Sequence, residues 1–151
     1  MYLLATVLTL ALAAGGQTAA KPNFSGQWKM NAAKSSFGAL PAPQTLSRTI
    51  SHAEPALVIV EEQVGGLGEQ TTTRKYVTDG TETTFQAQGT DVKTAAVWAD
   101  GVLQVTSRVD ALGMTFVDKM SLSPDGQTLT SQIHIRSPQG DVEFAVVFEK
   151  Q

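Results

Sequence analysis

Two arginines and a tyrosine occupy alternating segments of the chain in which they would share a face with apolar residues. Arg48 falls in phase with Leu46 and Ile50, and Arg74 falls in phase with Tyr76. Side chains two residues apart lie on the same face of a β-strand. A guanidinium can hold a carboxylate through two parallel hydrogen bonds, which burial strengthens. We therefore predict that Arg48, Arg74 and Tyr76 meet the polar head of an amphipathic ligand, such as a carboxylate.

A carboxyl group stands in a similar position further along the chain. Asp118 falls in phase with the apolar residues Met114, Phe116 and Met120. Flexible methionines beside an aromatic ring suit a pliable wall for the apolar tail of a ligand, so we add these three residues to the predicted site. Asp118 is a rival partner for the arginines, because a protein carboxylate would satisfy a guanidinium without any ligand. A β-bulge or a wet barrel opening would instead place all these charges in water.

The other residues with catalytic or metal-binding chemistry do not assemble into a site. His52 and His134 are the only histidines and there is no cysteine, whereas a zinc site normally needs three or four such ligands. His52 precedes a turn and His134 falls on a polar face, so we expect both in solvent. Glu61 and Glu62 are adjacent and would point to opposite faces of a strand, which excludes a local carboxylate pair. The sequence therefore predicts no enzyme, no metal site and no cofactor.

Glycine turns divide the chain into short segments. Glycines recur at positions 80, 89, 101, 113, 126 and 140, and three of them follow aspartate, a dipeptide that tolerates the positive φ angles of tight turns. The intervening segments alternate apolar and polar residues, as half-buried strands do. No segment after residue 20 keeps a helical period, although a single helical turn fits near 32–35. We predict ten strands, at about 24–30, 45–52, 56–63, 69–79, 82–88, 91–99, 102–109, 114–123, 127–136 and 141–149.

Short strands joined by tight turns pair with their sequence neighbours and give an antiparallel up-and-down meander. A meander of ten strands has exposed edges unless it closes. We therefore predict an all-β protein in which residues 21–151 form a single barrel domain. Two packed sheets or a partly open clam would share the same local structure. Trp28, a bulky residue on the first predicted strand, is expected to plug one end of the barrel.

The first twenty residues have the pattern of an export signal. The apolar run Leu3–Ala14 is uncharged and too short to anchor in a bilayer, but it suits a signal peptide. We predict a signal peptide over residues 1–20 and cleavage before Lys21, which makes the protein periplasmic or extracellular and free of the membrane. With 11 basic and 14 acidic residues, a net charge of −3 and no basic cluster, the chain is a poor partner for nucleic acid.

The first predicted strand carries a family resemblance. Residues 24–31 read FSGQWKMN, and the spacing of Gly26 and Trp28 resembles the Gly-x-Trp signature of the lipocalins and their calycin relatives. The stretch 33–43 and the tail Phe148–Gln151 are similar to a group of uncharacterised secreted bacterial proteins with the same opening. Lipocalins bind small apolar molecules inside a β-barrel, so the resemblance implies a lipocalin-like barrel. The fatty-acid-binding proteins also have ten strands, but residues 32–44 are too few for the two helices that follow their first strand.

A barrel of this size either holds a ligand or is filled by its own side chains. We predict a secreted or periplasmic, non-enzymatic barrel that binds a small apolar or amphipathic molecule. The alternative is a structural or protein-interaction module with a self-filled core and no ligand. The volume of the interior distinguishes the two.

Overall fold

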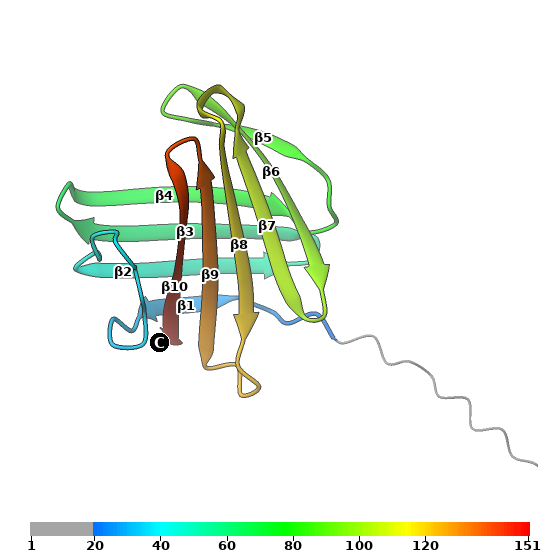
Figure 1. Cartoon of the computed structure of the whole chain (residues 1–151). Coiled ribbons are helices and arrows are strands. Elements are labelled where there is room, and N and C mark those ends of the chain that lie inside the picture. The colour runs from blue at the N-terminus through cyan, green and yellow to red at the C-terminus, as the bar shows by residue number, and fades with distance from the viewer. Residues whose placement is uncertain (1–19) are drawn as a thin grey trace, which may run out of the picture.

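Ten antiparallel strands follow one another along the chain, and each of the ten predicted segments overlaps one of them (Figure 1). The computed structural model describes residues 20–151, so the predicted signal peptide lies outside the described residues except for Ala20. A 3-10 turn, η1 (Asp110–Leu112), lies between the seventh and eighth strands. The strands are β1 (Gly26–Met30), β2 (Thr45–Ala53), β3 (Ala56–Gly65), β4 (Gly68–Val77), β5 (Thr83–Ala87), β6 (Thr90–Ala99), β7 (Val102–Val109), β8 (Met114–Leu122), β9 (Thr128–Ser137) and β10 (Gly140–Lys150).

Two of the hairpins show how the turn residues fix the strand order. Gln88 and Gly89 join β5 to β6 with φ angles of 51° and 78°, and Asp100 and Gly101 join β6 to β7 with φ angles of 50° and 77°. Positive φ at both central residues defines the type I′ turn, whose twist matches that of the flanking strands. Such turns set adjacent strands antiparallel, which is the pairing observed for β5–β6 and β6–β7.

The strands form one sheet with the order β4-β3-β2-β1-β10-β9-β8-β7-β6-β5. In Figure 1, β2, β3 and β4 cross β7 to β10, so the sheet folds over on itself. The pairing of β1 with β10 leaves β4 and β5 as its two edges, and the barrel is nearly closed with a seam between them. The predicted meander is confirmed except at this seam. There the backbone of the β4–β5 connection bonds elsewhere: Thr78 N donates to Pro55 O at 2.8 Å and Gly80 N to Ala96 O at 2.9 Å.

One half of the barrel interior is solid. Its largest fully buried side chains are Trp28, Phe24, Phe148, Leu57 and Leu103, each at most 1% exposed. The indole Nε1 of Trp28 donates to the carbonyl of Phe24 at 2.9 Å, so its only polar atom is satisfied within the core. Trp28 is therefore buried as the sequence predicts.

The connection between β1 and β2, residues 31–44, runs without a helix. It forms a turn at residues 32–34, where the sequence suggested a single helical turn. Ser36 makes an isolated β-bridge with Ala145 of β10, and the ring of Phe37 stacks on that of Phe144. These contacts hold the connection against β10. Among the described residues, no helix has the length and apolar character needed to cross a membrane.

Candidate functional site

The other half of the barrel contains a cavity of about 500 Å³ that is partly open to solvent. The β1–β2 connection contributes Phe37, Leu40, Pro41 and Pro43 to its lining. Its other walls are mainly apolar side chains from seven strands, among them Leu46, Val105, Phe116, Ile133, Phe144 and Val146. A volume of this size falls within the range of about 300–1,000 Å³ typical of small-molecule sites. The residues of the solid half, such as Trp28 and Leu103, do not line it.

A cluster of charged residues lies in the cavity wall, with Glu61 at its centre. The Glu61 carboxylate accepts a hydrogen bond from Arg48 Nε at 2.7 Å and another from Arg74 Nη2 at 3.0 Å. Burial favours the neutral carboxylic acid, but the two adjacent guanidiniums outweigh it and lower the pKa of Glu61 to about 2. One ionised carboxylate therefore holds two arginines, and these three groups together carry one positive charge.

Arg48 extends this cluster to Asp118 through a serine. Arg48 Nη1 donates to Ser131 Oγ at 2.8 Å, and Ser131 Oγ donates to Asp118 Oδ2 at 3.1 Å. The Arg48 guanidinium also lies over the ring of Phe148, 4.5 Å from its centroid. The other oxygen, Asp118 Oδ1, is the one buried side-chain polar atom without a hydrogen-bond partner in residues 20–151. Burial raises the pKa of Asp118 above its usual value, against the attraction of Arg48.

Free hydrogen-bond donors remain on the β4 side of the cavity. Among residues 20–151, the side chain of Arg74 makes no hydrogen bond except the one from Nη2 to Glu61, and the hydroxyl of Tyr76 makes none. Both side chains line the cavity. Burial raises the pKa of Tyr76 to about 12, so its hydroxyl keeps its proton and can donate. An acceptor inside the cavity can therefore be bound without breaking the Glu61 pairs.

The structure brings four of the six predicted site residues to the cavity wall: Arg48, Arg74, Tyr76 and Phe116. Met114 and Met120 do not line it, which corrects the predicted wall. Met120 is 1% exposed in the solid half of the barrel, and Met114 is the first residue of β8. Alternate residues share a face along the whole strand, but a strand of nine residues spans roughly 26 Å and extends beyond the cavity at both ends.

The protein carboxylate that pairs with the two arginines is not Asp118, the rival partner that the sequence suggests. Glu61, rather than Asp118, makes ion pairs with both Arg48 and Arg74, and Asp118 reaches Arg48 only through Ser131. Glu61 falls in phase with the inward residues Leu57 and Ile59 of β3, and this signal in the sequence could have placed it inside. The alternative that places the charges in water is wrong for Arg48, which is 4% exposed.

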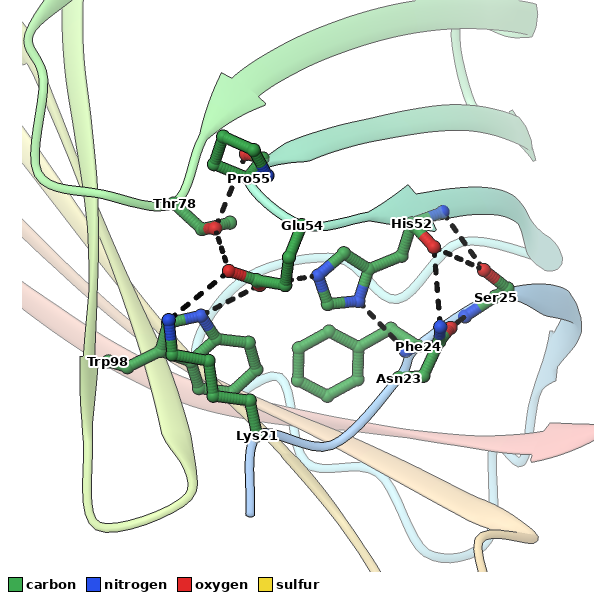
Figure 2. Close-up of polar contacts among 9 residues, drawn as sticks. All are labelled: Lys21, Asn23, Phe24, Ser25, His52, Glu54, Pro55, Thr78 and Trp98. Atoms are coloured by element: carbon green, nitrogen blue, oxygen red, sulfur yellow. Dashed lines mark hydrogen bonds and ion pairs between the residues drawn. The ribbon is translucent and has the colours of Figure 1, made fainter. Parts of the chain in front are cut away.

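A second polar cluster fastens the solid end of the barrel across the seam. Figure 2 shows the Glu54 carboxylate, from the β2–β3 turn, among three donors and Lys21. It is bonded by His52 Nε2 at 2.8 Å, Thr78 Oγ1 at 2.8 Å and Trp98 Nε1 at 2.9 Å. Burial acts against the ionised form, but these bonds lower the pKa of Glu54 to about 2. Because Thr78 follows β4 and Trp98 lies on β6, the cluster joins the two sides of the seam.

His52 is a structural residue of this end, and the expectation that it is solvated is wrong. It is 6% exposed, and its ring stacks on the ring of Phe24, 5.6 Å between centroids (Figure 2). The backbone N–H of Phe24 donates to Nδ1 at 3.2 Å, so the proton lies on Nε2 and is donated to Glu54. His52 falls in phase with Ile50, which was the available signal. His134 lies toward the outer face, beside Asp141.

The strand arrangement matches that of known barrels. No protein-family model matches the chain, and neither does any curated protein. A secretory abundant heat soluble protein of Ramazzottius varieornatus is 16% identical over 85% of this chain and 95% of its own, with a TM-score of 0.66. The chain has the fold of the calycin barrels.

Two further solved structures share this fold. Fatty-acid-binding protein 1 of Echinococcus granulosus is 14% identical over 84% of this chain and 96% of its own, with a TM-score of 0.57. Zebrafish ileal bile acid-binding protein, solved with cholic acid, is 14% identical over 85% of this chain and 98% of its own, with a TM-score of 0.59. At these identities the likeness concerns the fold alone. Both neighbours carry the names of binding proteins, not of enzymes.

Proposed function

We propose that this protein is a non-enzymatic carrier that binds a small amphipathic molecule inside its barrel. The observation that carries the proposal is the cavity of about 500 Å³, with apolar walls and a single charged cluster. An apolar pocket with a few convergent polar groups is the usual form of a small-molecule site. Two barrels with the same fold have names that state fatty-acid binding and bile-acid binding, which is consistent with a ligand of this class.

The charged cluster determines how such a ligand would be oriented. Arg74 and Tyr76 have free donors that face the cavity, and the arginines exceed Glu61 by one charge. A carboxylate head would accept hydrogen bonds from these donors, and its apolar tail would lie against Phe116, Ile133 and Phe144. The ligand carboxylate would thus join the pair of Glu61 and Arg74 without replacing it.

The alternative of a self-filled barrel describes only half of the interior. The solid half is packed by large side chains such as Trp28 and Phe148, whereas the cavity half leaves room for a molecule. A barrel that served only as a structural module would gain stability by filling that space, because cavities are costly. The cavity therefore favours a ligand.

We extend the proposal to the place where the protein acts. The apolar run Leu3–Ala14 and the small residues after it support export to the periplasm or the cell exterior, with residues 1–20 removed. A carrier there would meet amphipathic molecules at low concentration in water, where an apolar interior provides the driving force for uptake.

The test is a titration of delipidated protein with decanoic acid, in which calorimetry measures the binding. We expect Arg74→Met to weaken binding by about tenfold or more, because a charge-assisted hydrogen bond contributes about 1.5–3 kcal/mol. Stability should change little, because Glu61 keeps its bond to Arg48. Arg108→Met is the matched control, since Arg108 forms a surface ion pair with Glu82 at 2.7 Å. If the wild-type protein binds neither decanoic acid nor 1-decanol, the proposed function is wrong.

A further inference from the structure

The charge balance of the cluster allows one more negative group. Arg48 and Arg74 supply two positive charges and Glu61 one negative charge, so one positive charge is uncompensated. Asp118 can supply the missing charge in the empty barrel. A ligand carboxylate can supply it in the complex. Two negative groups together would leave a net negative charge in an apolar cavity, which is unfavourable.

The hydrogen bonds of Asp118 show where a proton would go. Arg48 Nη1 can only donate, so Ser131 Oγ accepts that bond and gives its own hydrogen to Asp118 Oδ2. Oδ2 is thereby an acceptor, and a proton on Asp118 belongs on Oδ1. Oδ1 is the buried oxygen that has no partner in residues 20–151, and the Asp118 side chain lines the cavity.

We propose that Asp118 is a proton-linked ligand-binding residue, which takes up one proton from solvent when a carboxylate-bearing molecule enters the cavity. The Oδ1–H group then donates a hydrogen bond to the ligand carboxylate, and Arg74 donates another. Apart from the new O–H bond of Asp118, no covalent bond forms or breaks. This inference rests on the proposed function, since it describes how a ligand of that class is held.

The groups that face Asp118 do not titrate in the same range. Glu61 of β3 has a pKa of about 2 and stays ionised, and Tyr76 of β4 has a pKa of about 12 and stays neutral. Arg48 and Arg74 stay charged. The residues paired with Asp118 in the neighbouring strands β7 and β9 are Val105 and Ile133, which do not ionise. Burial raises the pKa of Asp118 above its ordinary value, and its Oδ1 is the unpartnered oxygen at the cavity, so among these groups Asp118 is the one that can change its charge when a ligand enters.

The experiment compares decanoic acid with 1-decanol between pH 5.5 and 9 by calorimetry. As pH rises through the range where Asp118 ionises in the free protein, we expect decanoate binding to weaken by up to about tenfold per pH unit. Calorimetry in buffers with different ionisation heats should show uptake of close to one proton per decanoate bound. The affinity for decanol should not depend on pH, because decanol brings no charge.

The variant Asp118→Asn replaces the protonated acid with an amide of the same shape. It should bind decanoate at every pH with no slope, while Asp141→Asn, at an exposed site beside His134, should behave as wild type. Decanol binding by Asp118→Asn reports that its cavity is intact, and the proton count on the wild type needs no variant at all. A flat decanoate profile in the wild type, or a slope that persists in Asp118→Asn, would overturn the inference while leaving the proposed function standing.

Discussion

Replacing Glu61 by glutamine should cost the protein a large part of its stability. The Glu61 pKa falls from 4.5 to about 2 in the folded state, although burial alone would raise it. Since one pKa unit corresponds to about 1.4 kcal/mol, the ionised carboxylate contributes on the order of 3 kcal/mol relative to the neutral acid. Loss of one partner from a buried ion pair typically costs about 3–5 kcal/mol, because the other charge stays buried. We therefore expect Glu61→Gln to lower the free energy of unfolding by about 3 kcal/mol at pH 7.

Urea unfolding monitored by circular dichroism measures this change. Glu62→Gln is the matched control, because Glu62 is the next residue of β3 and is exposed on the opposite face; its effect should stay within about 0.5 kcal/mol. A depressed folded-state pKa gives stability that is present above the ordinary pKa and is lost as pH falls. The gap between Glu61→Gln and wild type should thus shrink from about pH 4.5 toward pH 2. A gap below about 1 kcal/mol at pH 7 would refute the assignment of Glu61 as the common partner of two arginines.

Three other predictions concern the core, Asp118 and the N-terminus. Trp28→Ala should destabilise the protein by about 3–5 kcal/mol in urea unfolding, because it empties the core of its largest side chain; a loss below about 1 kcal/mol would contradict this packing role. Asp118→Asn should raise the melting temperature at pH 8 but not near pH 3, because a raised folded-state pKa removes stability as pH rises above the ordinary value of 3.8. Equal melting temperatures of Asp118→Asn and wild type at pH 8 would mean that burial does not destabilise the ionised carboxylate of Asp118. N-terminal sequencing of the exported protein should begin near Lys21, and a chain that retains Met1 would exclude the predicted cleavage.

The strands could be predicted because their signals are local, whereas the seam depends on distant contacts. Asp100-Gly101 makes the tight turn that its residue types predict. The same dipeptide at Asp79-Gly80 looks identical in the sequence, but its glycine N–H bonds to Ala96 on β6 and not across a hairpin. Period and turn chemistry therefore identify the strands and most of their pairings. They do not show which neighbouring pair of strands stays apart.

The site could be predicted in part, because phase gives the face of a residue and not its neighbours. The phase of Arg48 with Leu46 and Ile50, and of Arg74 with Tyr76, places both arginines inside. Their common partner depends on the pairing of three strands, in which Arg48 lies opposite Glu61 and Arg74 lies opposite Ile59. Phase also does not give the position of a residue along the barrel axis, which is why the sequence predicts Met120 in the cavity although it belongs to the solid half.

The two ends of the barrel differ in how their buried polar groups are hydrogen-bonded, and this difference indicates where a ligand would bind. At the solid end, the buried polar side chain of His52 is fully bonded, and Glu54 joins both sides of the seam. At the hollow end stand a cavity and, in Asp118, the one buried polar side-chain atom of residues 20–151 that has no partner. An unsatisfied buried polar group costs about 1–3 kcal/mol. Proteins tend to keep such costs at functional sites, where a ligand removes them, and to offset them by consistent packing elsewhere. Because the cost and the cavity coincide here, the hollow end is where a ligand would stabilise this protein most.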